Sequence, residues 1–222
     1  MRVCALLSGG KDSNYALYKA ILEGAEVACI VVVYSRREDS WMFHTVNTWV
    51  AELQAEAMGF GDRVYRVEVS GVKEVEVLEL EEALTRLKGR VDFDTIALGA
   101  LASRYQRERV GRIAEKLGVK LYTPSWGSNQ EEYLRTLVRE GFKFILTSIT
   151  VMGLPYELLG KPIGFNEVEL IVKLSRTYGF NPAFEGGEAE TLVYDAPHYR
   201  RTICLQGRRV RVREFEYKLL ID

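Results

Sequence analysis

Residues 7–13, with the sequence Leu-Ser-Gly-Gly-Lys-Asp-Ser, constrain the fold of this chain more than any other segment. They end an apolar stretch, residues 3–7, that predicts a short buried strand, and they precede residues 14–22, whose apolar positions recur at helical spacing. A glycine pair between strand and helix allows a tight turn that brings backbone amides close to a ligand. Because a helix start also carries a positive dipole end, the segment predicts an anion-binding loop suited to phosphate.

The two better-known nucleotide-binding loops do not fit this segment. A Walker loop needs Ser or Thr after its Gly-Lys pair and a glycine five residues before Gly10, but Asp12 and Ala5 stand there. A Rossmann pattern is also absent, since the next glycine after Gly10 is Gly24. The remaining pattern, Ser-Gly-Gly-x-Asp-Ser, resembles the pyrophosphate (PP) loop of the ATP pyrophosphatases, which cleave ATP between its α and β phosphates. The predicted ATP-binding residues of the loop are Ser8, Gly9, Gly10, Lys11, Asp12 and Ser13, with Asp12 holding Mg²⁺.

The composition is that of an ordinary globular protein. The chain has 222 residues, 47% hydrophobic and 27% charged, which allows one large domain or one and a half. A net charge of −1 argues against direct nucleic-acid binding. No apolar run approaches the ~18 residues of a membrane helix, and no signal peptide precedes the loop. These features predict a cytoplasmic protein with no membrane partner.

The cysteines predict no disulfide and no metal site. Cys4, Cys29 and Cys204 all lie in apolar, strand-like runs, which favours reduced, buried thiols. There is no Cys-x-x-Cys, and the two histidines, His44 and His198, are far apart in the sequence, so a zinc site is not expected.

The first 150 residues alternate strand and helix patterns. The predicted helices span residues 14–22, 44–58, 74–88, 103–117 and 130–140, and the strands 3–7, 25–33, 63–69, 93–98 and 119–122. This alternation indicates an α/β fold with an open, mostly parallel, doubly wound sheet. Ligands in such sheets bind at the carboxyl ends of the strands. Ser8, Tyr34, Gly99 and Ala100 fall at predicted strand ends and should line one ATP-binding crevice.

From about residue 142 the pattern changes. A strand is predicted over residues 144–151, a helix over 167–178, and a hairpin from strands 202–205 and 210–219 that turns at Gly207 and Arg208. We expect a smaller α+β lobe here. The predicted division is a nucleotide-binding domain at residues 1–141 and a substrate-binding lobe at residues 142–222.

A second motif lies at residues 184–197, Phe-Glu-Gly-Gly-Glu-Ala-Glu-Thr-Leu-Val-Tyr-Asp-Ala-Pro. Alone, it would be interpreted as a solvated acidic loop. Together with the PP-loop it resembles the diphthine–ammonia ligase family, and residues 40–45, 99–109 and 125–127 agree with that resemblance. One departure is Ala189, where the family commonly has an aromatic residue.

The resemblance implies the last step of diphthamide synthesis. ATP, with Mg²⁺, would adenylate the carboxylate of diphthine on elongation factor 2, and ammonium would supply the amide nitrogen. A glutaminase needs a nucleophilic cysteine, and an N-terminal one would follow Met1, where Arg2 stands. A homodimer is compatible with this interpretation.

The same resemblance assigns roles to residues. Asp12, Glu185 and Glu188 would be catalytic, with Glu188 expected to be the most sensitive carboxylate, and His44 would join the ATP site. The implied substrate-binding residues are Arg104, Tyr105, Gln106, Arg109, Trp126, Glu185, Gly186, Gly187, Glu188, Glu190 and Thr191.

Two alternatives remain open from the sequence. The first is a tRNA-modifying PP-loop ATP pyrophosphatase, which the near-neutral charge disfavours. The second is a non-catalytic ATP-binding sensor module. Asp12 and the acidic loop argue against it, because a sensor does not require two such polar groups of residues.

Overall fold

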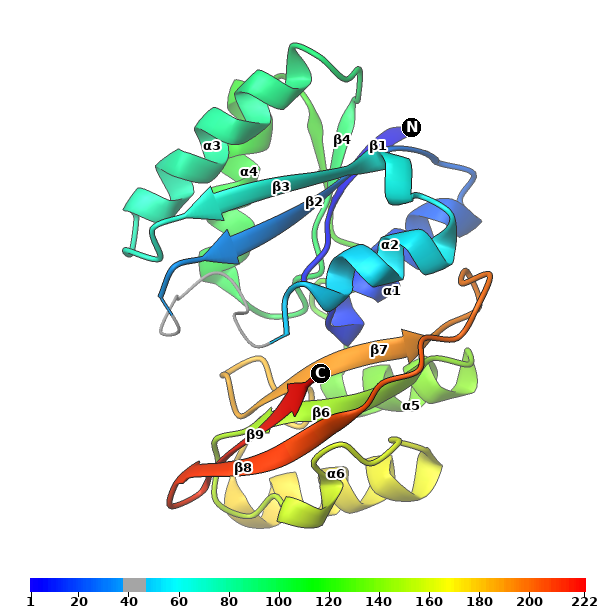
Figure 1. The fold of residues 1–222 in the computed structure, drawn as a ribbon, viewed down its shortest axis with the longest axis vertical. Helices are drawn as coiled ribbons and strands as arrows, with labels where there is room; N and C mark the ends of the chain where they lie inside the picture. The colour runs from blue at the N-terminus through cyan, green and yellow to red at the C-terminus, as the bar shows by residue number, and fades with distance from the viewer. Residues whose placement is uncertain (38–46) are drawn as a thin grey trace.

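The computed structural model describes residues 1–37 and 47–222, and in it two sheets are stacked end to end (Figure 1). The N-terminal sheet is parallel throughout, with the strand order β3-β2-β1-β4-β5. This confirms the predicted doubly wound α/β fold. Its strands are β1 (Arg2–Leu6), β2 (Glu26–Ser35), β3 (Val64–Val69), β4 (Thr95–Ala97) and β5 (Lys120–Tyr122).

Helices cover both faces of this sheet because strand residues alternate between them. Val3 and Ala5 of β1 pack with α1 (Lys11–Leu22) and α2 (Val50–Met58). Cys4 and Leu6 face the opposite way, toward α3 (Val75–Lys88) and α4 (Arg104–Lys116). The strand order reverses direction between β1 and β4, so a ligand crevice is expected at their carboxyl ends.

The second sheet is antiparallel, with the order β7-β6-β9-β8. Two helices, α5 and α6, cover one of its faces (Figure 1). Helix α5 contributes Tyr133, Leu134 and Leu137 to this second core. The domain boundary at residue 141 stays a prediction. The elements are α5 (Gln130–Arg139), β6 (Lys143–Ile149), α6 (Phe165–Tyr178), β7 (Ala189–Asp195), β8 (Gly207–Arg213) and β9 (Glu216–Ile221).

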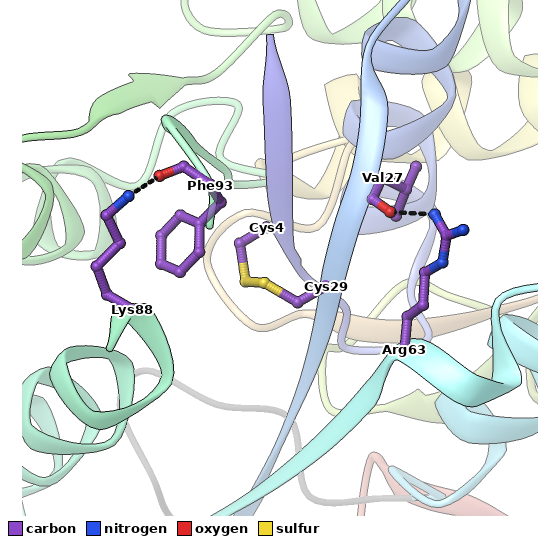
Figure 2. The surroundings of a disulfide bond; sticks show 6 residues. All are labelled: Cys4, Val27, Cys29, Arg63, Lys88 and Phe93. Atoms are coloured by element: carbon purple, nitrogen blue, oxygen red, sulfur yellow. Dashed lines mark hydrogen bonds between the residues drawn. A yellow bond between two sulfur atoms is a disulfide. The ribbon is translucent and has the colours of Figure 1, made fainter. Parts of the chain in front are cut away.

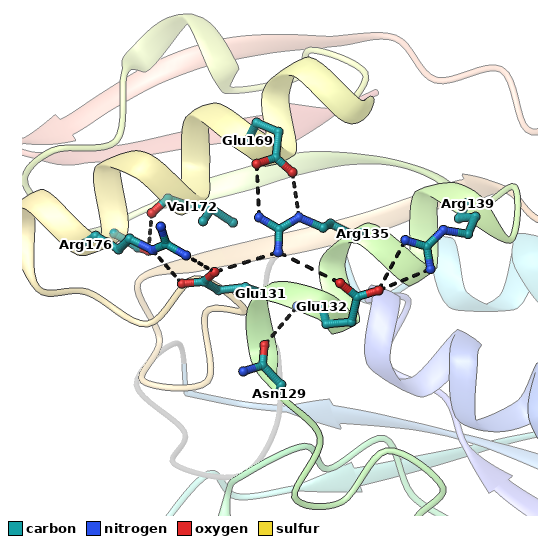
Figure 3. Close-up of polar contacts among 9 residues, drawn as sticks. Asn129, Glu131, Glu132, Arg135, Arg139, Glu169, Val172 and Arg176 are labelled. Carbon is teal, nitrogen blue, oxygen red and sulfur yellow. Dashed lines mark hydrogen bonds and ion pairs between the residues drawn. The ribbon is translucent and has the colours of Figure 1, made fainter.

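An ion-pair network joins α5 to α6 on the outside of the second lobe (Figure 3). Arg135 makes a two-point contact with Glu169, at 2.6 and 3.0 Å, and Arg176 pairs with Glu131. Exposed pairs of this kind each contribute little, about 0–1 kcal/mol. The apolar core beneath them therefore does most to hold the two helices together.

The sequence misplaced part of the second lobe. Residues 202–205 form no strand, and the terminal hairpin consists of β8 and β9, turning at Glu214 and Phe215 rather than at Gly207. The turn has no glycine signal because Phe215 itself adopts a positive φ of 59°. Strand β7 was hidden inside the acidic motif. The predicted helix from His44 begins instead at Val50 within the described residues, and His44 and the whole segment 40–45 lie outside them.

The prediction of three reduced, buried thiols is wrong. A disulfide joins Cys4 of β1 to Cys29 of β2, which are register partners on neighbouring strands (Figure 2). Adjacent parallel strands bring such partners within disulfide reach, with a Cα–Cα distance of 4.5 Å here. Cys204 is exposed and free.

We expect thiol titration of the unfolded, unreduced protein to find one reactive cysteine, and three after reduction. The bond closes a loop of sequence separation 25, so its loss should lower the free energy of unfolding by about 3 kcal/mol. A Cys4→Ala/Cys29→Ala variant checks this by urea denaturation. Three reactive thiols without reductant would contradict the bond.

His198 packs between aromatic rings, 5.4 Å from Tyr18 and 5.8 Å from Phe142, measured between ring centroids. Both of its ring nitrogens are buried without a hydrogen-bond partner among the described residues. Burial therefore lowers the pKa of His198 from 6.5 to about 4.

When the solution is acidified, His198 consequently binds a proton at a higher pH in the unfolded chain than in the folded chain. The free energy of unfolding is therefore unaffected by His198 above pH 6.5. It falls as the pH drops from 6.5 toward 4, by about 3 kcal/mol in total. His198→Phe should remove this part of the pH dependence in urea denaturation. An unchanged slope between pH 6.5 and 4 would show that His198 is not the group responsible.

Candidate active site

A pocket opens at the carboxyl ends of β1 and β4, where the change in strand order predicts one. Ser8, Asp12 and Ser13 of the PP-loop line it, together with Gly99 and Gln106 of the central motif. The rest of the lining is apolar and consists of Leu6, Leu7, Val31, Val33 and Leu98. An apolar wall beside a polar loop suits a nucleotide, with its base on the wall and its phosphates at the loop.

The PP-loop is held in shape by its own serines. Ser13 Oγ accepts from the amide of Ser8 at 3.1 Å and lies 3.1 Å from Ser8 Oγ. Ser8 Oγ in turn accepts from the amide of Gly10 at 3.4 Å. Gly9 has a φ of +89°, which side-chain-bearing residues rarely adopt, so the first glycine of the motif is required by the backbone.

Gly99 is required for a different reason, which is close packing of β4 on α1. A Cβ atom there would lie 2.3 Å from the amide nitrogen of Ser13 and 2.5 Å from the carbonyl oxygen of Asp12. The glycine therefore lets the start of α1 approach the end of β4, and this approach shapes the pocket.

Lys11 and Asp12 form a pair at the seam between the two lobes. The Lys11 ammonium, 2% exposed, donates to Asp12 Oδ2 at 2.8 Å and to the carbonyl of Ala183 at 2.7 Å. The other carboxylate oxygen, Asp12 Oδ1, is buried with no hydrogen-bond partner among the described residues. A buried carboxylate oxygen beside a phosphate loop suits a hard cation.

The acidic motif reaches the same place from the second lobe. Glu185 Oε2 accepts from the amides of Ala102 and Ser103, at 2.7 and 3.0 Å, at the start of α4. Burial and the nearby Asp12 charge raise the pKa of Glu185. Tyr133 of α5 faces both carboxylates, and burial followed by the charge of Asp12 raises its pKa well above the ordinary value.

Glu188 has a more local role. Its carboxylate accepts from the amide of Asn181 at 2.9 Å and from that of Gly186 at 2.9 Å. These bonds close the loop that contains Gly186 and Gly187. Glu190 follows on β7, and Thr191 Oγ1 accepts from the amide of Lys11 at 3.1 Å. The acidic motif is therefore hydrogen-bonded to the PP-loop.

The aromatic and basic residues of the central motif pair with one another. The Arg109 guanidinium lies 3.7 Å from the centroid of the Tyr105 ring and pairs with Glu74 at 2.6 Å. The Arg107 guanidinium lies 4.5 Å from the Trp126 ring. Each of these two rings therefore has an arginine guanidinium over its face. Arg104 is exposed at the start of α4, and Ala100 is buried.

The structure separates Tyr34 from this pocket. Its side chain packs with the α1 and α2 face of the sheet, whereas Val31 and Val33 of the same strand line the pocket. The Tyr34 hydroxyl donates to Glu52 at 2.5 Å. Tyr34 does not line this pocket, because one position along a strand reverses the face, and its role in ATP binding stays a prediction.

Sequence reasoning also missed residues of the site. Asn14, Gln54 and Tyr133 are buried polar residues around the PP-loop, on three different helices. Buried amides inside predicted helices were the available signal for the first two. No group of three or more His, Cys, Asp or Glu residues that could hold a metal occurs in residues 1–37 and 47–222.

Known proteins match the chain along nearly its whole length. The family profile described as "Diphthamide synthase N-terminal domain" matches residues 1–121, and "Diphthamide synthase C-terminal domain" matches residues 129–219. The rat protein named "Diphthine--ammonia ligase" is 33% identical over 92% of this chain and 83% of its own length. The human protein of that name is 33% identical over 95% of this chain and 85% of its own.

The fission yeast relative, with the same name, is 32% identical over 95% of this chain but only 37% of its own length. A solved structure from Methanocaldococcus jannaschii, described as a predicted subunit of tRNA methyltransferase, is a weak likeness, with a TM-score of 0.45 and 16% identity over 89% of this chain and 98% of its own. Both profiles match, and their two regions contain the three motifs that contact one another around the PP-loop, so this chain belongs to the diphthamide synthase family.

Proposed function

We propose that this chain is an ATP-dependent ligase that converts diphthine on elongation factor 2 into diphthamide, using ammonium and releasing AMP and pyrophosphate. The observation that carries the proposal is the contact among three motifs: the PP-loop, the start of α4, and the acidic motif. The Lys11 amide donates to Thr191 of the acidic motif, and Glu185 of the same motif accepts from Ala102 and Ser103. The family of the chain agrees with it. A tRNA-modifying enzyme and a nucleotide sensor are not favoured.

ATP would lie with its phosphates on the PP-loop. Ser8 and Ser13 offer hydroxyls, and the start of α1 offers its positive dipole end. The residues present fit Mg²⁺, because Asp12 Oδ1 is a buried carboxylate oxygen without a hydrogen-bond partner among the described residues, and Mg²⁺ commonly takes one carboxylate plus phosphate oxygens. When bound, the ion would neutralise charge on the departing pyrophosphate.

The chemistry then needs two displacements. The diphthine carboxylate attacks the α phosphorus, pyrophosphate leaves, and an acyl-adenylate forms. Ammonia attacks the acyl carbon, AMP leaves, and the attacking nitrogen gives up a proton to solvent to form the amide. Ammonium must lose a proton before it attacks, and we assign that proton to Glu185, whose raised pKa makes it a stronger base than an ordinary carboxylate.

The substrate contacts follow from charge. Diphthine carries a permanent trimethylammonium cation, which the carboxylates of the acidic motif can bind. Tyr105 or Trp126 would offer a ring face to it once Arg109 or Arg107 is displaced from that face. Cys4 and Cys29 are joined to each other, and the free thiol of Cys204 does not line the pocket, so neither offers a glutaminase nucleophile beside the PP-loop. We therefore propose free ammonium as the nitrogen source. As a separate proposal, the reaction takes place in the cytoplasm. None of the described helices is long and apolar enough to cross a bilayer.

The test is incubation with diphthine-bearing elongation factor 2, ATP, Mg²⁺ and ammonium, with mass analysis of the modified histidine and chromatography of the nucleotides. Diphthamide, AMP and pyrophosphate in equal amounts are expected. A parallel reaction with glutamine instead of ammonium should give no amide. ADP and phosphate as stoichiometric products, or no amide at all, would reject the proposal.

A further inference from the structure

The side chain of Gln54, on α2, is fully buried and joins three separate elements. Its Nε2 donates to the carbonyl of Gly9 at 2.9 Å and to the carbonyl of Val193 on β7 at 2.7 Å. Its Oε1 accepts from Asn14 Nδ2 on α1 at 3.1 Å. One amide group therefore connects the PP-loop, the helix that follows it, and the edge strand of the second sheet.

These contacts determine how the peptide between Gly9 and Gly10 is oriented. The Gly9 carbonyl accepts from Gln54 Nε2 and also from the amide of Val193, at 3.1 Å. In a planar trans peptide the carbonyl and the next N–H point in opposite directions. Gln54 of α2 and Val193 of β7 both hold the Gly9 oxygen, so the Gly10 N–H points the opposite way, toward Ser8 Oγ, and Ser8 lines the pocket.

Hydrogen bonds from Asn14 extend the same arrangement. Asn14 Nδ2 also donates to the carbonyl of Gly10 at 3.0 Å, and its Oδ1 accepts from the Tyr199 hydroxyl at 2.7 Å. Buried polar networks whose members are satisfied favour one arrangement of the backbone, since any other leaves polar groups unpaired. Tyr199 lies at the outer end of this network and makes no contact with Gly9 in the hydrogen bonds described.

We propose that Gln54 is a positioning residue for ATP: it fixes the Gly9–Gly10 peptide so that the Gly10 amide faces the phosphates, and it makes this geometry depend on β7. The proposal rests on the proposed function only in that the PP-loop binds ATP. Gln54 itself touches no substrate. Its effect should therefore be specific for the phosphates and absent for the nucleoside.

The test compares ATP and adenosine binding in Gln54→Met, which keeps length and loses the hydrogen bonds. Calorimetry is performed where circular dichroism shows the variant to be folded, with Gln54→Asn as the milder second variant. Tyr199→Phe is the matched control, because it removes a hydrogen bond of the same network without touching Gly9. ATP affinity should fall about tenfold for Gln54→Met and less than about threefold for Tyr199→Phe, and adenosine affinity should stay the same in both.

Equal losses of ATP and adenosine affinity in Gln54→Met, or no loss in either Gln54 variant, would overturn the proposal. Failure of the parent protein to bind ATP would overturn both this proposal and the proposed function. ATP binding that responds to Gln54 as expected, without amidation of diphthine, would reject the proposed function and leave Gln54 as a positioning residue.

Discussion

Asp12→Asn should remove most AMP formation, on the order of 100-fold, while also lowering stability. The change is nearly isosteric and removes the negative charge that we propose binds Mg²⁺. It also leaves the Lys11 ammonium, which is 2% exposed, without its carboxylate partner. Removing one member of a buried ion pair typically lowers the free energy of unfolding by about 3–5 kcal/mol.

A second variant separates these two effects. Lys11→Met combined with Asp12→Asn removes the unpaired charge, so its stability should return toward that of the parent. Its AMP formation should stay low. AMP is measured by chromatography and stability by urea denaturation. A double variant that recovers full turnover, or an Asp12→Asn protein with near-normal turnover at saturating Mg²⁺, would show that Asp12 is not a metal ligand.

Glu185→Gln should lower amidation on the order of 100-fold and leave ATP affinity within a few-fold of the parent. The amide oxygen of glutamine can still accept from Ala102 and Ser103, so the start of α4 stays in place. What is lost is the base. Glu188→Gln is the matched control, since Glu188 serves its own loop through Asn181 and Gly186 and should affect stability more than amidation. From this geometry we expect the Glu185 substitution to lower amidation more than the Glu188 substitution, the reverse of the expectation from sequence.

The pH dependence gives an independent check on Glu185. Its pKa is raised, so its basic form is lost at a higher pH than for an ordinary glutamate as the solution is acidified. Amidation, plotted against the concentration of ammonium, should show an acidic limb above pH 4.5 that vanishes in Glu185→Gln. The same limb in both proteins would assign the proton transfer to another group.

Local patterns in the sequence were enough to predict the doubly wound sheet. Each strand and helix of the first lobe has its own apolar period, and strands β1 and β2 are buried on both faces. The PP-loop follows β1 and Gly99 follows β4. The topology of the sheet then predicts that both lie at the ligand crevice, because β1 and β4 are the strands between which the order reverses. Function followed from motif resemblance, which the family match confirms.

Contacts between distant segments could not be predicted in this way. One partner of the Lys11 ammonium is 172 residues away at Ala183, and one partner of the Gln54 amide is 139 residues away at Val193. Neither contact leaves a periodic signal. The disulfide was missed for a related reason, since the pairing register of β1 and β2 is set by the whole sheet and not by the residues around each cysteine.

The seam between the lobes bears on how the protein can be divided. The two family profiles meet between residues 121 and 129, an obvious place to cut the gene into separately expressed halves. The N-terminal half would keep every residue of the PP-loop but lose Val193, Ala183 and Thr191, which satisfy its Gly9 carbonyl, Lys11 ammonium and Lys11 amide. Such a fragment should have little affinity for nucleotide alone and regain it when the C-terminal fragment is added, so that the split pair would act as a complementation reporter.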